Sequence, residues 1–171
     1  CKQGNATLHG TGVHPSFMAE RVGLAFTQLV TQPQHMRFIE AVDFSYMPDG
    51  MWGGLTTIGF GLPIESLDEN FIVAKAGDFY YGDVTGNIGH LLYGYDSSQI
   101  RLERRFRAIP AKEDFKVGNT WIRKGCAAAL HMMHLGYVGD HHFFTNEECW
   151  YLGPNEEYRG DDLPYGDFQT P

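Results

Sequence analysis

The sequence predicts an α+β domain in which two main helices pack on one face of a mixed, mostly antiparallel sheet. Two stretches have the spacing of apolar residues that is typical of helices, and the C-terminal half carries long runs rich in β-forming residues. Gly139-Asp140, between the last two runs, is typical of a hairpin turn. Because the helices are not interleaved with the last strands, they are expected to gather on one face of the sheet.

The N-terminal part of the chain is expected to contain the first helix and two strands. We predict a short strand over residues 5–9, a break over 10–15 and a helix over 16–31, where apolar residues recur at helical spacing. A second strand is predicted over residues 35–46, where apolar residues share one phase. Residues 47–70 are rich in glycine and proline, and so long an irregular segment in a compact domain tends to be functional.

The remainder is predicted to hold one more helix, over residues 71–95, followed by strands over 99–109, 121–138 and 141–152. Glycines recur inside the predicted helix, at Gly77, Gly82, Gly86 and Gly89. Each costs about 1 kcal/mol relative to alanine. We therefore expect them to allow close helix–helix packing within the chain, with a dimer contact as the alternative.

Composition excludes several classes of function. The chain has 171 residues, enough for one domain, and its 43% hydrophobic and 20% charged residues are typical of a globular protein. A net charge of −8 argues against a nucleic-acid partner. The apolar stretches are too short for a membrane span. Three cysteines without a C-x-x-C pair predict reduced thiols and a cytoplasmic location, not a disulfide scaffold.

Two groups of residues have the composition of catalytic or metal sites. Histidines gather around the predicted final hairpin, at His131, His134, His141 and His142, near Cys126, Glu147, Glu148 and Cys149. Residues i and i+3 of a strand point to opposite faces, so His131 and His134 should not converge, and no metal site is expected. The same argument separates Glu40 from Asp43, which favours structural roles for these two carboxylates.

Gly10-Thr11-Gly12, between the first predicted strand and helix, forms a turn that can approach a ligand closely. A dinucleotide-binding turn requires G-x-G-x-x-G, but the sixth position is Pro15. Neither that motif nor a phosphate-binding G-x-x-x-x-G-K-S/T occurs elsewhere in the sequence. The chain therefore carries no sequence motif for nucleotide phosphates.

The segment over residues 7–17, TLHGTGVHPSF, resembles the L-H-G-T-G-[IV]-N-P-G-F segment of diaminopentanoate dehydrogenase and related amine dehydrogenases, which belong to the dihydrodipicolinate-reductase-like oxidoreductases. EAVDFS, residues 40–45, resembles the family's E-x-x-D-x-S strand, and IRKGCAA, residues 122–128, resembles its I-x-K-G-T-V-A-G strand. The order and spacing of the three segments match those of the family, so the resemblance covers nearly the whole chain. His14 replaces the usual Asn and Ser16 the usual Gly.

The resemblance implies that residues 1–171 form a substrate-binding and dimerisation domain, in a homodimer that acts on a small amine or ketone. NAD(P) would be bound mainly by a Rossmann domain absent from this chain, and hydride would pass between the nicotinamide and an amine or imine carbon. The chain, which begins with Cys1, would start where that first domain ends. The family's catalytic acid matches no residue here.

The resemblance also implies a substrate pocket near the first motif. Gly10, Thr11 and Gly12 would line the side nearest the nicotinamide, and His14 would orient a polar group while adding a titratable imidazole. Apolar walls are predicted, from position alone, at Trp52, Phe60 and Tyr80. The alternative is a free-standing, non-catalytic α+β module that binds a small ligand.

Overall fold

A computed structural model describes residues 2–8, 12–47 and 50–153, apart from the side chain of Trp52. Its centre is a mixed sheet of four strands in the order β1-β6-β5-β2. The strands span Met36–Asp43 (β1), Arg101–Pro110 (β2), Ala127–Val138 (β5) and His141–Tyr151 (β6). β1 runs parallel to β6, and the other neighbours are antiparallel. The predicted α+β class, with a mostly antiparallel mixed sheet, is confirmed.

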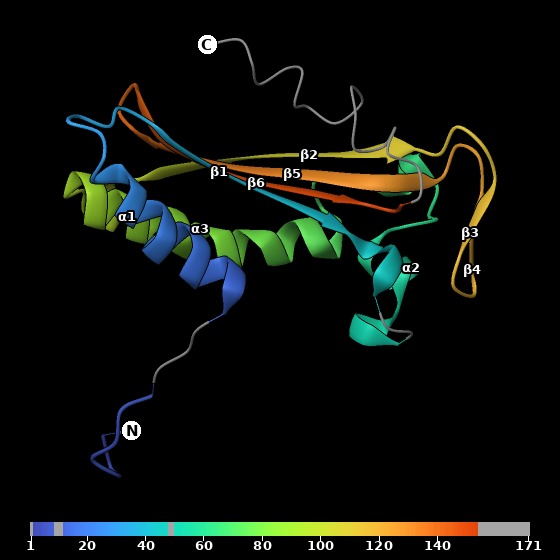
Figure 1. Ribbon diagram of the computed structural model, residues 1–171, viewed down its shortest axis with the longest axis horizontal. Helices are drawn as coiled ribbons and strands as arrows, with labels where there is room; N and C mark the ends of the chain where they lie inside the picture. The colour runs from blue at the N-terminus through green and yellow to red at the C-terminus, as the bar shows by residue number, and fades with distance from the viewer. Residues whose placement is uncertain (1, 9–11, 48–49, 154–171) are drawn as a thin grey trace.

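Two helices lie on one face of this sheet (Figure 1). The first, called the N-terminal helix below, consists of a wide π-helical segment, Val13–Gly23, and the α-helical turn α1, Leu24–Thr27. The second is α3, Ile72–Tyr93. Ala19 of the N-terminal helix is fully buried, and the adjacent Glu20 accepts a hydrogen bond from the amide of Asn87 on α3. None of the described helices combines the length and the apolarity that crossing a membrane requires.

Short elements close one end of the sheet. Residues 50–70 contain the helical turn α2, Leu55–Ile58, and 3-10 turns at Met51–Gly53 and Ile64–Ser66. The hairpin of β3, Phe115–Val117, and β4, Thr120–Ile122, projects from the same end (Figure 1). Further 3-10 turns follow β1 and α3, at Phe44–Tyr46 and Ser97–Gln99. The helical turn α2, the hairpin and the turns at Phe44–Tyr46 and Ile64–Ser66 contribute to the larger of two hydrophobic clusters, which includes Phe60, Leu130 and Trp150.

The predicted first strand is wrong for the part of residues 5–9 that the structure describes. Asn5 belongs to a turn, residues 6–8 have no regular structure, and Leu8 is 83% exposed. A strand requires a neighbour for its backbone hydrogen bonds. The described edges of the sheet are β1 and β2, and neither pairs with this segment.

The first helix is shorter than the sequence predicts. His14, Pro15 and Ser16 have non-helical backbone angles, and the helical turns begin after them, where the Phe17 amide donates to the Gly12 carbonyl. At the other end the regular helix stops at Thr27, whose hydroxyl donates to the Leu24 carbonyl at 2.7 Å. Leu29, which helped to predict a longer helix, is 82% exposed and does not face the sheet.

Three of the four glycines of α3, Gly77, Gly82 and Gly89, face the sheet, which corrects the expectation of helix–helix packing. A Cβ atom on Gly77 would lie 3.0 Å from Cε1 of His134, and one on Gly89 would lie 3.1 Å from the ring of Phe143. His134 and Phe143 belong to β5 and β6, not to another helix. Gly86, by contrast, has open space where its Cβ would be.

Alanine substitution should therefore have opposite effects at two positions of α3. Gly89→Ala is expected to lower the free energy of unfolding by about 1–3 kcal/mol, because its methyl group would press on the buried Phe143 ring. Gly86→Ala should raise it by up to about 1 kcal/mol through helix propensity alone. Urea unfolding measures both variants. Equal effects would contradict the proposed close approach of Gly89 to the sheet.

Candidate functional site

A cavity of about 580 Å³ lies between the sheet and the helix layer. Its apolar wall includes Val42 of β1, Ile58 of α2, Val73 of α3 and Met132 of β5. The polar side chains at the cavity are few, and they are His14, Glu40, Thr57, Tyr80, Tyr81 and Trp150. A largely apolar pocket of this size with a few polar groups is typical of a site for a small organic ligand.

Glu40 is the acidic residue of the cavity lining. It lies on β1 with its side chain on the helix face of the sheet, and its Oε1 accepts a hydrogen bond from Nε1 of Trp150 at 3.0 Å. Burial raises the pKa of the Glu40 carboxyl above its ordinary value, and the hydrogen bond from Trp150 opposes this only in part. The cavity therefore holds a carboxyl group that releases its proton less readily than one in water.

A second carboxyl, that of Glu148, lies next to Glu40 within the protein. The two residues are register partners on the parallel strands β1 and β6, so their side chains leave the same face of the sheet. Glu148 is fully buried, and its side chain is hydrogen-bonded by the amide of Asn146. Burial raises the pKa of Glu148 well above its usual range, and the charges of Glu40 and Glu147 raise it further.

Two buried histidines flank Glu148. Nε2 of His14 lies 3.6 Å from Oε1 of Glu148, and Nδ1 of His134 lies 3.6 Å from Oε2. Burial lowers the pKa of each imidazole to about 4, so both rings are neutral near pH 7. His134 also lies 3.5 Å from Asp78 of α3. The raised pKa favours the protonated form of Glu148, which avoids an uncompensated buried charge between the two neutral imidazoles.

His14 is held in place by aromatic contacts. Its ring centroid lies 4.4 Å from that of Phe38 on β1 and 5.1 Å from that of Tyr81 on α3, with the Tyr81 ring stacked. Neither His14 nitrogen has a hydrogen-bond partner among the described residues. An unpaired buried nitrogen beside a cavity can bind a polar group of a ligand.

The structure brings together only part of the predicted pocket. His14 and Tyr80 line the cavity with Glu40. Phe60 is 0% exposed and lies in the core, where it packs against the cavity residue Phe44 with ring centroids 5.6 Å apart. Gly12 is exposed and precedes the N-terminal helix. Gly10, Thr11 and the side chain of Trp52 lie outside the described residues.

Sequence reasoning did not select Tyr81 or Trp150, and it noted Glu148 only as a neighbour of the histidines at the final hairpin. Tyr81 adjoins the predicted Tyr80, but only the orientation of α3 makes it a buried wall of the cavity. The sequence does contain a signal for Glu148, because a glutamate inside a run of β-forming residues needs a hydrogen-bonding or charged partner if it is buried. Its position beside Glu40 depends on strand register, which no local pattern reveals.

A second group of buried polar side chains lies on the other face of the sheet. His131 hydrogen-bonds Glu147, and Cys149 donates to the same carboxylate. His134 contacts α3, so His131 and His134 do point to opposite faces, as the strand pattern predicts. The residue types of this second group can bind a metal ion.

Comparison with models of known protein families and with curated proteins found no significant match to this chain. The resemblance to amine dehydrogenases therefore depends on the three segments quoted above, over residues 7–17, 40–45 and 122–128. Two of them contribute to the cavity, through His14 and Glu40.

Glu148→Gln should change how stability depends on pH. Because the folded-state pKa of Glu148 is raised above its usual value of 4.5, the folded protein keeps a proton that the unfolded chain releases. Wild-type stability therefore loses up to about 1.4 kcal/mol per pH unit from this group as pH rises above about 4.5, until the folded-state pKa is reached. The glutamine variant lacks this loss.

Urea unfolding between pH 5 and 7 measures the difference, with the exposed Glu69→Gln as control. Both proteins also share an opposing contribution from His14 and His134, whose lowered pKa values weaken the fold as pH falls. This contribution cancels when the unfolding free energy of wild type is subtracted from that of the variant. A free-energy difference that does not change with pH would show that Glu148 is ionised in the folded protein.

Proposed function

We propose that this chain forms the substrate-binding domain of an NAD(P)-dependent oxidoreductase that interconverts small apolar amines with ketones or imines. The observation that carries the proposal is the apolar cavity whose acidic group is the partly buried Glu40. The lining that the structure describes contains no lysine or arginine. Such a wall disfavours a carboxylate or phosphate group on the ligand and favours a neutral or cationic one.

An amine ligand fits the electrostatics of this cavity. Its ammonium or iminium group would stabilise the ionised form of Glu40 and so offset the burial that raises the pKa of this carboxyl. The unpaired nitrogens of His14 offer a second polar contact, and the apolar walls suit a hydrocarbon substituent. Glu40 is thus assigned to the nitrogen of the substrate, and His14 to its orientation.

The nicotinamide would supply hydride transfer to or from the substrate carbon. The described lining has no lysine or arginine for a pyrophosphate, so this domain would meet the nicotinamide end and the phosphates would bind elsewhere. The residues of this chain would hold the substrate, exclude water around it and exchange a proton at Glu40. The homodimer and the cytoplasmic location remain predictions from the sequence.

Glu40→Gln in the full-length protein should lower kcat/KM for amines and ketones by roughly 10- to 100-fold. The substitution removes a charge-assisted contact with the substrate nitrogen, worth about 1.5–3 kcal/mol. Binding of NADH and NADPH should be nearly unchanged. A panel of amines and ketones, assayed with both cofactors, measures the loss, and the exposed Glu69→Gln is the control.

Three results would sort the hypotheses. Turnover that falls in Glu40→Gln but not in Glu69→Gln supports the assignment. A variant with wild-type turnover would contradict it. Calorimetry could instead show that the wild-type protein binds amines but turns none of them over with either cofactor. That result would favour the non-catalytic ligand-binding module.

Ala76→Phe should shift substrate preference toward smaller ketones. Ala76 lines the cavity from α3, and a phenyl ring there would fill part of the 580 Å³. We expect kcat/KM for ketones with branched or cyclic substituents to fall by roughly 10-fold or more, since each displaced methylene is worth about 1–3 kcal/mol. Lys75→Phe adds the same ring at an exposed position outside the lining. If kcat/KM depends on the size of the ketone in the same way for both variants, the substrate binds elsewhere.

A further inference from the structure

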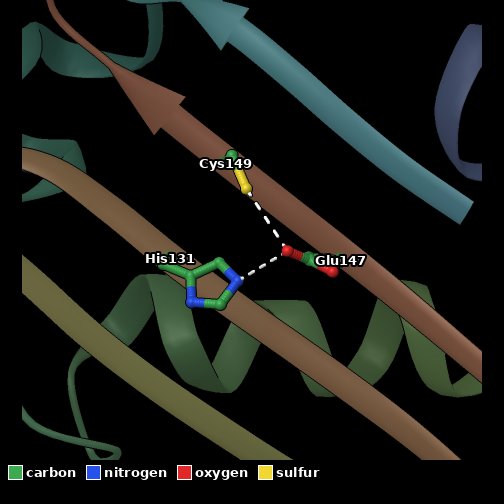
Figure 2. Close-up of side chains that lie close together, drawn as sticks. All are labelled: His131, Glu147 and Cys149. Atoms are coloured by element: carbon green, nitrogen blue, oxygen red, sulfur yellow. Dashed lines mark hydrogen bonds and ion pairs between the residues drawn. The ribbon is translucent and has the colours of Figure 1, made fainter. Parts of the chain in front are cut away.

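Three buried side chains meet on the sheet face opposite α3. His131 comes from β5, and Glu147 and Cys149 come from β6 (Figure 2). His131 and Cys149 are direct cross-strand partners, and Glu147 precedes Cys149 by two positions, so all three leave the same face. All three are buried, and α3 lies behind the strands in this view (Figure 2). This group is therefore distinct from the cavity between sheet and helices.

The three donor atoms are spaced like the ligands of a tetrahedral metal ion. Nε2 of His131 lies 3.0 Å from Oε1 of Glu147, and Sγ of Cys149 lies 3.6 Å from the same oxygen. The three atoms lie within 4.8 Å of one another. Zinc bonds of about 2.0–2.3 Å at tetrahedral angles separate neighbouring ligand atoms by roughly 3.3–3.8 Å. Coordination would require the three atoms to adjust from these separations to that range.

Arg37 fixes the carboxylate that both other groups contact. Its Nε and Nη2 donate to Oε2 of Glu147 at 3.0 and 2.7 Å. The other oxygen, Oε1, therefore faces His131 and Cys149 (Figure 2). A hydrogen-bonded outer partner that orients a ligating carboxylate is a usual part of metal sites.

The chemistry of the group disfavours the other use of such residues, a reactive cysteine. Burial raises the pKa of the Cys149 thiol, and the neighbouring Glu147 raises it further, so the sulfur is a neutral thiol near pH 7. Burial lowers the pKa of His131, which keeps its imidazole neutral and able to bind a metal. A thiol in this state is a poor nucleophile, but a bound cation can displace its proton.

We propose that His131, Glu147 and Cys149 bind one Zn²⁺ ion through Nε2, Oε1 and Sγ. The S–H bond of Cys149 breaks as the sulfur–zinc bond forms, and the proton leaves to solvent. A water molecule would be the fourth ligand. The ion joins the two central strands of the sheet, so its first effect is on stability. The expectation of no metal site depended on the opposite directions of His131 and His134. In the structure His131 instead lies beside Glu147 and Cys149, which the sequence already placed near the same hairpin.

The test uses Co²⁺, a spectroscopic substitute for Zn²⁺, and the full-length protein. Wild type should bind one equivalent at this site, with a thiolate-to-cobalt charge-transfer band in the near ultraviolet and release of about one proton near pH 7. Cys149→Ser should lose the band. Cys126→Ser should keep it, because Cys126 is a free cysteine outside the group and serves as the matched control.

A second variant covers the case in which Cys149→Ser does not fold. His131→Gln keeps the thiol and removes one ligand, so its affinity for Co²⁺ and Zn²⁺ should fall roughly 10- to 100-fold or more, the loss found even for outer partners of metal ligands. Zn²⁺ should raise Tm in wild type and Cys126→Ser, and by less in His131→Gln. Absence of the band in wild type, its survival in folded Cys149→Ser or unchanged affinity in His131→Gln would each overturn the proposal.

Discussion

The parallel pairing of β1 with β6 is the constraint on which both groups of polar residues depend. The register places Glu40 beside Glu148 on the helix face and Ile39 beside Glu147 on the other face. Arg37, two residues earlier than Ile39, thereby comes within hydrogen-bond distance of Glu147. A shift of one residue would exchange the two faces of β1 and separate every one of these contacts.

Burying this many ionisable groups is tolerated because most of them are neutral or paired. On the helix face, the raised pKa of Glu148 and the lowered pKa values of His14 and His134 remove charge from the interior. On the opposite face, Glu147 is paired with Arg37. The cost of burying charged groups is thus reduced in two ways, by shifted pKa values on the helix face and by ion pairing on the opposite face.

The helix layer gives the first face its cavity. Glycines at Gly77 and Gly89 let α3 approach β5 and β6 closely, while Tyr80 and Tyr81 of the same helix line the cavity. The N-terminal helix follows the non-helical residues at its start, which bring His14 to Phe38 and Tyr81. Gly77 itself also lines the cavity, so the same stretch of α3 both contacts β5 and forms a wall of the pocket.

The sequence by itself determined the α+β class, the final hairpin and the second helix, because hydrophobic periodicity and turn residues act locally. It also selected His14 and Tyr80 as pocket residues, favoured a structural role for Glu40, and separated His131 from His134 by strand alternation. Only the tertiary structure decided that Glu40 adjoins Glu148, that Phe60 lies in the core and that residues 6–8 form no strand. β1 and β6 are about 100 residues apart in the chain. Their register follows from packing across the whole sheet, which no short segment encodes.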